Sequence, residues 1–360
     1  MTTTSERLSE TLTREVSKRV SQSVFDGSPL RVVLLVDVFD GAQQQFLEAY
    51  EQLCAQVASV PGHVSDQLCQ SIENPSQWLI TSEWESAPPF LTWVNSEEHV
   101  RMVEPLHSCV RDTRSLRFHI VRETSGASAA EKSADRRLQA HPRIGDGVTR
   151  HALTFTVKPG SEEKVAKLLS DYESPEPQVD GSTRLCRTSL YMHGNRVVRA
   201  IEVRGDLLAA LRHVAQQPEV RAVEEAINPY LEQDRDLDDQ ESARLFFTRA
   251  ALPAVHHVSA AERPEDTRLA LFYPALPGEG MRLAELLAAS DQAASQDPSS
   301  QVLRSTVFQR DDVVVRLVDV RGVDADALPR DAAAAAEARK LLAGEASRMD
   351  LVTDRRSPEV

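Results

Sequence analysis

Three stretches of the chain begin with the same pattern of apolar and polar residues. They read RVVLLVDVFDG from Arg31 to Gly41, RHALTFTVKPG from Arg150 to Gly160, and RLALFYPALPG from Arg268 to Gly278. Each has Arg first, Leu fourth, and Asp-Gly or Pro-Gly last, which is typical of a strand that enters a tight turn. Apolar residues then recur at spacings of three and four, and this spacing predicts a helix after each turn.

The second and third stretches match again further along, at Leu185–Gly205 and Leu303–Gly322. In both, alternating apolar residues flank a polar turn, HGN or RDD, which predicts a β-hairpin. Charged residues recur at matched positions, namely Arg187 with Arg304, Arg199 with Arg316, Arg204 with Arg321, and Glu202 with Asp319. Ion pairs between neighbouring strands explain this recurrence without any catalytic role.

Each hairpin is followed by a helical pattern, which in the third stretch is the alanine-rich DAAAAAEARKLLAGE. A last strand is predicted at SLRFHIVRE in the first stretch and at ARLFFTRAAL, residues 243–252, in the second. The order β-α-β-β-α-β is that of a ferredoxin-like unit. Its recurrence predicts an α+β chain of three tandem ferredoxin-like units.

Segments of small, polar and charged residues separate these units. The predicted boundaries are a flexible N-terminal arm at 1–29, a first unit at 30–122, a linker at 123–147, a second unit at 148–252, a degenerate third unit at 265–345, and a loose tail at 346–360. The linker composition, ETSGASAAEKSADRRLQAHPRIGDG, has no apolar periodicity.

A four-stranded sheet with helices on one face leaves its other face open, and an apolar open face has to be buried. Two such sheets bury both faces when they pack together as a dimeric α+β barrel. We predict that units two and three pair within the chain and that unit one pairs with unit one of a second copy, which gives a homodimer. Alternatively, units one and two pair and unit three is a cap.

The net charge of −14 argues against a nucleic-acid partner, which requires a basic stripe, and equally against an anionic membrane surface. No apolar run is long enough for a membrane helix, and the N-terminus lacks the apolar core of a signal peptide, so a cytoplasmic protein is expected. Four scattered cysteines indicate free thiols. His256 and His257 are neighbours on a predicted strand and face opposite ways, so we expect no metal site there.

Unit one carries several ordered motifs: VPGHVS from Val60, EWES from Glu83, FLTWVNSEEH from Phe90, and PLH from Pro105. Over residues 31–121 these motifs resemble the antibiotic biosynthesis monooxygenase family. Units two and three resemble the SchA/CurD-like region that follows such a domain in proteins of aromatic polyketide and spore-pigment clusters. The resemblance implies oxidation of an anthrone or phenol to a quinone by O2, without metal or flavin.

Such chemistry needs no cofactor, because a deprotonated anthrone or phenol can itself reduce O2. The protein has to bind a flat aromatic polyketide, remove a proton and stabilise the anion, within apolar walls that exclude water. Haem-degrading relatives of this fold place a haem-ligating His ten residues after a helix Trp. Here that position after Trp93 is Val103, so haem is not expected.

Period-two alternation assigns residues of two strands to common faces. One set is Trp78, Ile80, Ser82 and Trp84, and the other is His63, Ser65, Gln67 and Cys69. In a family member a Trp, an Asn, a His and a Tyr are thought to line the pocket. By the resemblance these positions fall at Trp84, Ile80, Cys69 and Phe90, so only the Trp is retained.

We predict that Trp84, His99 and His63 are catalytic. The predicted substrate-binding residues are Trp78, Cys69, Ile80, Phe90, Trp93 and His107. Structural explanations compete with these roles: the Trp side chains pack in the core, His99 lies near a helix cap, and His63 is exposed after Pro-Gly. A polyketide cyclase and a non-catalytic partner of polyketide enzymes remain alternative functions, since both use an apolar pocket without O2 chemistry.

Overall fold

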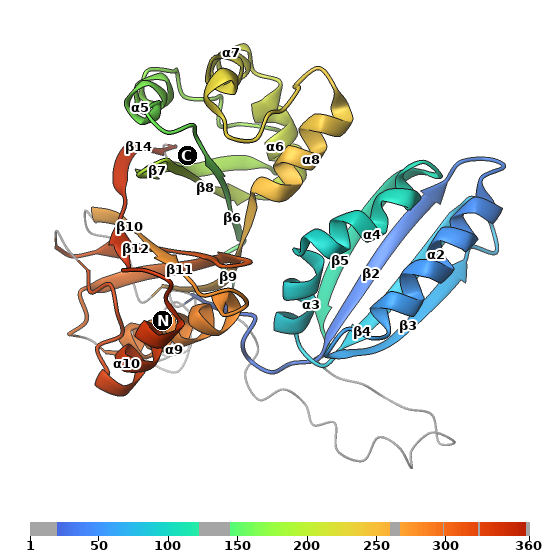
Figure 1. Ribbon diagram of the computed structural model, residues 1–360, viewed down its shortest axis with the longest axis horizontal. Helices are drawn as coiled ribbons and strands as arrows, with labels where there is room; N and C mark the ends of the chain where they lie inside the picture. The colour runs from blue at the N-terminus through green and yellow to red at the C-terminus, as the bar shows by residue number, and fades with distance from the viewer. Residues whose placement is uncertain (1–19, 122–144, 260–266, 298, 323–324, 358–360) are drawn as a thin grey trace, which may run out of the picture. The chain divides into compact units, whose positions relative to one another are not determined.

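The computed structural model describes residues 20–121, 145–259, 267–297, 299–322 and 325–357 (Figure 1). Contacts divide the chain into two compact domains. Among the described residues, the first domain comprises residues 24–121, and the second comprises residues 20–23 together with those from 145 onward.

The first domain has the element order β-α-β-β-α-β, with its second helix split in two. Its elements are β2 (Leu30–Val38), α2 (Gln43–Val57), β3 (His63–Gln70), β4 (Gln77–Trp84), α3 (Ala87–Val94), α4 (Glu97–His107) and β5 (Val110–His119). The four strands form an antiparallel sheet in the order β3-β4-β2-β5. This is the ferredoxin-like arrangement that the sequence predicts.

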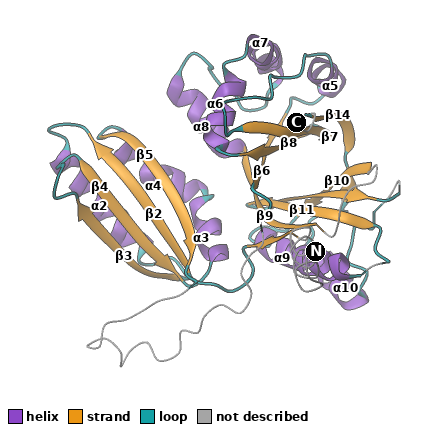
Figure 2. Ribbon diagram, turned by 180° about the vertical axis from the view of Figure 1, so that it is seen from behind, coloured by secondary structure: helices purple, strands orange, loops and turns teal. Residues whose placement is uncertain are grey.

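The helices of the first domain cover one face of this sheet (Figure 2). Even-numbered residues of β2, such as Val36 and Val38, face the helices and form a core with Phe46, Trp78 and Leu106. Odd-numbered residues lie on the other face, where Leu35 is 44% exposed and Phe118, on β5, is 52% exposed. This second face is therefore open and partly apolar.

The second domain contains two strand-and-helix segments. Segment 148–259 consists of β6 (Val148–Thr156), α5 (Glu162–Ser170), β7 (Arg184–His193), β8 (Arg196–Arg204), α6 (Leu207–Ala215), α7 (Pro218–Ile227), the 3-10 turn η2 (Asn228–Tyr230), α8 (Gln240–Ala250) and β9 (Ala251–Ser259). Segment 267–356 consists of β10 (Thr267–Pro274), α9 (Gly280–Gln296), β11 (Val302–Arg310), β12 (Val313–Val320), α10 (Ala332–Leu341), β13 (Ser347–Arg348) and β14 (Asp350–Arg356).

The strands of both segments join in one path, β14-β7-β8-β6-β9-β11-β12-β10-β13. Helices α5 to α8 lie on one outer side, and α9 and α10 lie on the other (Figure 1). Between them, Tyr191 and Val198 of the first segment share a buried cluster with Phe308 and Val315 of the second. The two segments therefore have a common core, and the strands that join them are β9, which pairs with β11, and β14, which pairs with β7.

Three sequence expectations for the chain outside the first domain are wrong. Residues 243–250, expected as a strand, belong to α8, because Asp239 caps that helix and Phe246 and Ala250 pack into the core one turn apart. The strand β9 follows, so the segment ends at 259 rather than 252. The expected loose tail forms β13 and β14, and Met349 between them is buried.

The expected flexible arm contains a short strand, β1 (Val20–Ser23), which pairs with residues 256–259 of β9. That pairing satisfies backbone groups along β9 that β6 leaves unpaired, because β6 pairs only with residues 251–253. Most of the expected linker, up to residue 144, lies outside the described residues.

Candidate functional site

Five aromatic side chains gather in the first domain between the sheet and its helices. Trp84 lies at the centre and is fully buried. Its ring centroid is 5.2 Å from His63, 5.3 Å from Phe90 and 5.4 Å from Trp93, and Trp93 is 4.4 Å from His99. The structure therefore brings together the three residues predicted to be catalytic and two of those predicted to bind substrate.

Local sequence explains how this aromatic cluster forms. Trp84 ends β4, and two prolines at the start of α3 begin a helix at once, which places Phe90 and Trp93 one turn apart above Trp84. Ser96 then caps α4 by accepting a hydrogen bond from the His99 backbone N–H, at 3.1 Å. The capping role proposed for this region is thus real, and it leaves the His99 ring against Trp93.

A β-bulge determines which side chains of β3 join the cluster. His63 lies opposite Trp84, whereas Ser65, two residues on, lies opposite Glu83. The extra residue reverses the alternation, so His63 faces the helices while Cys69 lies exposed on the opposite face. The expectation that His63 and Cys69 share a face is wrong, and Cys69 does not reach the cluster.

The same bulge brings Asp66, which the sequence analysis missed, beside His63. Its Oδ2 lies 2.7 Å from His63 Nε2, and both side chains are largely buried. Burial raises the pKa of Asp66 and the adjacent His63 partly counteracts this rise. Burial, together with the nearby Asp66 carboxylate, also raises the pKa of Tyr50 to about 12. The geometry is that of a histidine oriented by a carboxylate.

Hydrogen-bond donors also face this region. Trp84 Nε1 donates to Ser82 Oγ at 3.0 Å. Trp93 Nε1 is buried and has no hydrogen-bond partner among the described residues. The Arg117 guanidinium, on β5, lies 5.3 Å from the centre of the Phe90 ring. Arg117 was not predicted, although period-two alternation on β5 places it on the helix-facing side.

The remaining predicted residues lie elsewhere in the first domain. Trp78 is buried against Phe46, with 5.4 Å between ring centroids, and Ile80 packs in the same core. His107 is an exposed residue at the end of α4. Core packing thus accounts for Trp78 and Ile80.

The second domain contains a buried network of ion pairs between its two segments. Arg268 contacts both oxygens of Asp319, at 2.7 and 3.0 Å, and reaches Glu202 at 2.7 Å. Arg187 pairs with Asp354 and also lies 3.4 Å from Asp319. Burial alone would raise the pKa of Glu202, but Arg268 and Arg150 lower it to about 2. Of the recurrent charges, Arg187, Glu202, Arg304 and Asp319 thus belong to this network, in which several ion pairs bridge the two segments. Arg199 and Arg316 instead pair with helix residues, Glu224 and Asp291.

The adjacent histidines of β9 are both buried, with the pKa of His256 lowered by burial to about 4 and that of His257 to about 3. His257 Nδ1 lies 2.8 Å from Thr306 Oγ1. Within the ranges described above, no group of three or more His, Cys, Asp or Glu side chains is arranged to hold a metal ion. No helix there is long and apolar enough to cross a membrane.

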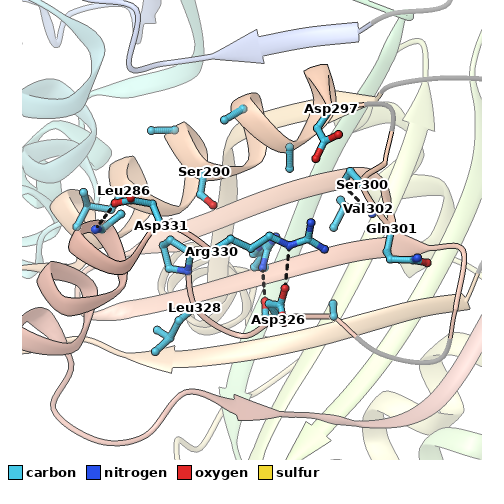
Figure 3. A pocket seen from close by; sticks show the side chains of 17 residues that line it. Leu286, Ser290, Asp297, Ser300, Gln301, Val302, Asp326, Leu328, Arg330 and Asp331 are labelled. Carbon is cyan, nitrogen blue, oxygen red and sulfur yellow. Dashed lines mark hydrogen bonds and ion pairs between the residues drawn. The ribbon is translucent and has the colours of Figure 1, made fainter.

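A cavity of about 550 Å³ opens in the second domain between α9 and the loop that precedes α10 (Figure 3). Its walls are mainly aliphatic, with Leu286, Val302 and Leu328 among them. Arg316 and Ser290 contribute polar groups. This cavity was not expected from the sequence.

Comparison with known proteins gives two family matches within the chain. Residues 29–105 match the antibiotic biosynthesis monooxygenase family, and residues 148–260 match the SchA/CurD like domain. A solved structure of SnoaB, a cofactor-independent oxygenase from Streptomyces nogalater, aligns with 27% of this chain and 96% of its own, at 18% identity and a TM-score of 0.25.

Three curated relatives match over most of their length. The 42.8 kDa protein in the whiE locus of Streptomyces coelicolor is 61% identical over 92% of this chain and 84% of its own. Protein SchA of Streptomyces halstedii and polyketide synthase CurD of Streptomyces cyaneus are each 63% identical, over 85% of this chain and 82% of theirs. The chain therefore belongs to the SchA/CurD family, with an antibiotic biosynthesis monooxygenase domain followed by a SchA/CurD-like domain.

Proposed function

We propose that this protein is a cytoplasmic tailoring enzyme of aromatic polyketide biosynthesis, and that its first domain is a cofactor-independent monooxygenase. The substrate is an anthrone or phenol, and O2 is the second substrate. The observation that carries the proposal is the contact of the His63–Asp66 pair with Trp84, beside the unpartnered indole N–H of Trp93.

The reaction begins with removal of a proton from the anthrone by His63. Asp66, 2.7 Å from the His63 ring, orients it and stabilises its protonated form. The negative charge then develops on the substrate oxygen, where the Trp93 N–H and the Arg117 guanidinium are the nearby donors. The Trp84 and Phe90 rings contact each other edge to face, and they supply the apolar surface against which a fused-ring substrate packs.

The carbanion passes one electron to O2, and the resulting radical pair combines to a peroxide at the same carbon. Loss of water from that peroxide, with a proton returned by His63, leaves the quinone. One oxygen atom is thus retained at the ring carbon, and the other leaves as water with the two hydrogens that the carbon carried. The protein supplies the base, the oxyanion donors and the enclosure, and the substrate supplies the electrons.

The test is oxygen uptake with an anthrone, using flavin-free and metal-stripped protein, with quinone absorbance followed in the same cuvette. We expect one quinone for each O2 consumed. His63→Asn should lower kcat about 100-fold or more, the size of a general-base contribution. The control, His107→Asn, changes an exposed histidine of the same domain. Uptake that is equal in both variants, or no uptake above the spontaneous rate, would reject the proposal.

A cyclase is the second candidate, because the His63–Asp66 pair is equally suited to forming an enolate for ring closure. The discriminating observation is the reaction of a poly-β-keto substrate without oxygen. Cyclised product that forms under anaerobic conditions and depends on His63 would favour this alternative. Binding without turnover in either assay would favour a non-catalytic partner of the polyketide enzymes.

We further infer that the chain consists of three ferredoxin-like units, here residues 30–119, 148–259 and 267–356. Matched strand registers support this: the residue before the recurrent arginine of each initial strand, Leu30, Thr149 or Thr267, lies opposite Trp84, Val203 or Val320. Each hairpin also has a β-bulge near its first pair, at His63/Ser65, Leu185/Arg187 and Val302/Arg304. Three shared bulges are difficult to explain without a common unit.

The buried core that the second and third units share supports a dimeric α+β barrel in which these two units pair within the chain. Unit one then pairs with unit one of a second copy through its open face. On that face Arg31 and Glu83 form an ion pair of 2.6 Å, at the positions that Arg268 and Asp319 occupy in the buried network. Leu35 and Phe118 beside it are the exposed apolar residues that a second copy would cover.

A further inference from the structure

We propose that the cavity in the third unit is a second binding site, for a neutral, flat, mainly apolar molecule that carries a carbonyl or phenol oxygen. An aromatic polyketide has this chemistry, and in naming that class the inference rests on the proposed function. The site is distinct from the His63–Trp84 cluster, because all of its lining residues come from segment 286–334.

The cavity occupies the place in unit three that the aromatic cluster occupies in unit one. The registers pair Val302 with Val320 in unit three, as they pair His63 with Trp84 in unit one. Val302 lines the cavity.

The three units fill this place differently. In unit one the large rings of Trp84, Phe90 and Trp93 occupy it. In unit two it is closed by an aliphatic cluster that includes Leu185, Val203, Ala210 and partly buried Leu207 and Leu211. In unit three the described residues 325–331, between β12 and α10, form a loop, where units one and two have α3 and α6 after the corresponding strand. This loop and α9 enclose a cavity of about 550 Å³, which falls within the range of small-molecule sites.

The polar groups of the cavity indicate the charge of its ligand. Arg316 is buried and lines the wall, but Asp291 compensates its charge through contacts of 2.5 and 3.1 Å. Ser305 donates to the same carboxylate, and Arg316 Nη1 also donates to the Asp326 carbonyl at 2.9 Å. The pair is thus neutral overall and does not call for an anion.

The rim of the cavity disfavours an anionic ligand further. Asp297 and Asp331 both line it, and the one exposed arginine of the lining, Arg330, is paired with Asp326 at 3.0 Å. Aliphatic side chains such as Leu286 and Leu328 cover most of the remaining wall (Figure 3). A neutral ring system with one or two oxygens therefore matches the site better than a phosphate or a carboxylate.

The test is calorimetric titration of the full chain with a dihydroxyanthraquinone. The variant Ala293→Trp places an indole across the cavity from an exposed position on α9, and its control, Ala336→Trp, makes the same change at an exposed alanine of α10 that does not line the cavity. We expect Ala293→Trp to bind one molecule fewer per chain, or at least about tenfold more weakly, and the control to match the wild type.

A second variant, Leu328→Asp, puts a charge in the loop that lines the cavity and is expected to cause the same loss of anthraquinone binding. It provides the test if Ala293→Trp fails to fold. Binding that is unchanged in both variants, or a wild type that binds no anthraquinone, would overturn the inference. Oxygen uptake without binding at the cavity would leave the monooxygenase proposal intact and reject the second site. Binding at the cavity without oxygen uptake would support the second site and reject the monooxygenase proposal.

Discussion

Two ion pairs at equivalent strand positions have different surroundings in the two domains. In the first domain Arg31 and Glu83 lie on the open face of the sheet, and the arginine side chain is 39% exposed. In the second domain Arg268 and Asp319 are 6% and 1% exposed and are enclosed between two segments. The same pairing, between an Arg on the first strand of a unit and an acid on its third strand, therefore occurs both on an open sheet face and in a buried core.

The surroundings of such an ion pair, rather than the pair itself, decide how much it contributes to the free energy of unfolding. A pair with an exposed partner contributes at most about 1 kcal/mol, because water screens it. A buried carboxylate that neutralises several arginines is different, since its removal leaves those charges without compensation. Asp319 lies within 3.4 Å of Arg187, Arg268 and Arg304.

The largest predicted effect is therefore the loss of Asp319. We expect Asp319→Ala to lower the free energy of unfolding of the second domain by about 3–5 kcal/mol, and Glu83→Ala to lower that of the first domain by about 1 kcal/mol or less. All three tryptophans, at positions 78, 84 and 93, belong to the first domain. Tryptophan fluorescence during urea unfolding thus reports that domain alone, while circular dichroism reports both.

The domain specificity of these two changes is the control. Asp319→Ala should shift the dichroism transition and leave the fluorescence transition in place. Equal shifts for Asp319→Ala and Glu83→Ala, or a fluorescence shift with Asp319→Ala, would mean that burial does not separate the two pairs.

The second prediction concerns pH and the buried histidines of the second domain. The pKa of His256 falls from 6.5 to about 4 on folding, chiefly through burial, and Asp291 opposes and Arg316 assists this shift. Because the folded-state pKa is lowered, the unfolded chain binds the extra proton. Stability is complete above pH 6.5 and is lost as the pH falls toward 4, by about 3 kcal/mol for this residue.

Urea unfolding at pH 7 and pH 4.5, followed by circular dichroism, measures this loss. His256→Leu should reduce it, since neither ring nitrogen of His256 has a hydrogen-bond partner among the described residues. His107→Leu, at an exposed position in the first domain, should not change it. The carboxyl group of Glu202, with a pKa of about 2, titrates below this window.

Much of this architecture is predictable from the alternation of apolar residues. The hairpins around HGN and RDD, the helices after each Gly, and the motif from Phe90 to His99 all fall where their patterns place them. Terminal segments are harder, because residues 20–23 and 347–356 have little apolar periodicity and become strands only through partners distant in sequence.

The candidate site was only partly predictable, for a local reason. The bulge after His63 adds one residue to β3, and nothing in the polar sequence HVSDQ marks it. The alternation therefore placed Cys69 on the same face as His63 and missed Asp66, which is three residues from His63 and pairs with it. The resemblance assigned Trp84, Phe90, Ile80 and Cys69 to the pocket. Of these, Trp84 and Phe90 lie in the aromatic cluster, whereas Ile80 and Cys69 do not.

The third prediction tests the open face of the first domain. If a second copy covers it as the two segments of the second domain cover each other, Phe118→Asp places a charge in an apolar interface. We expect the dimer dissociation constant to rise about 100-fold, which corresponds to about 2.7 kcal/mol. Sedimentation velocity measures this, with Ile72→Asp as the control at a fully exposed apolar residue of the β3–β4 turn. A wild type that sediments as a monomer at all concentrations would reject the proposed pairing.

The smallest predicted effect distinguishes two tryptophans on the same face of β4. Trp84 contacts His63 and Trp93, whereas Trp78 packs against Phe46 in the core. Trp84→Phe keeps an aromatic wall but removes its larger ring and its hydrogen bond to Ser82, so we expect kcat/KM for oxygen uptake to fall about tenfold, or about 1.4 kcal/mol. Trp78→Phe should change kcat/KM less than about threefold, although it too enlarges a buried space and lowers the melting temperature. Because both variants remove the same atoms from the same strand, equal losses of activity would mean that general destabilisation, rather than contact with His63, explains the effect of Trp84.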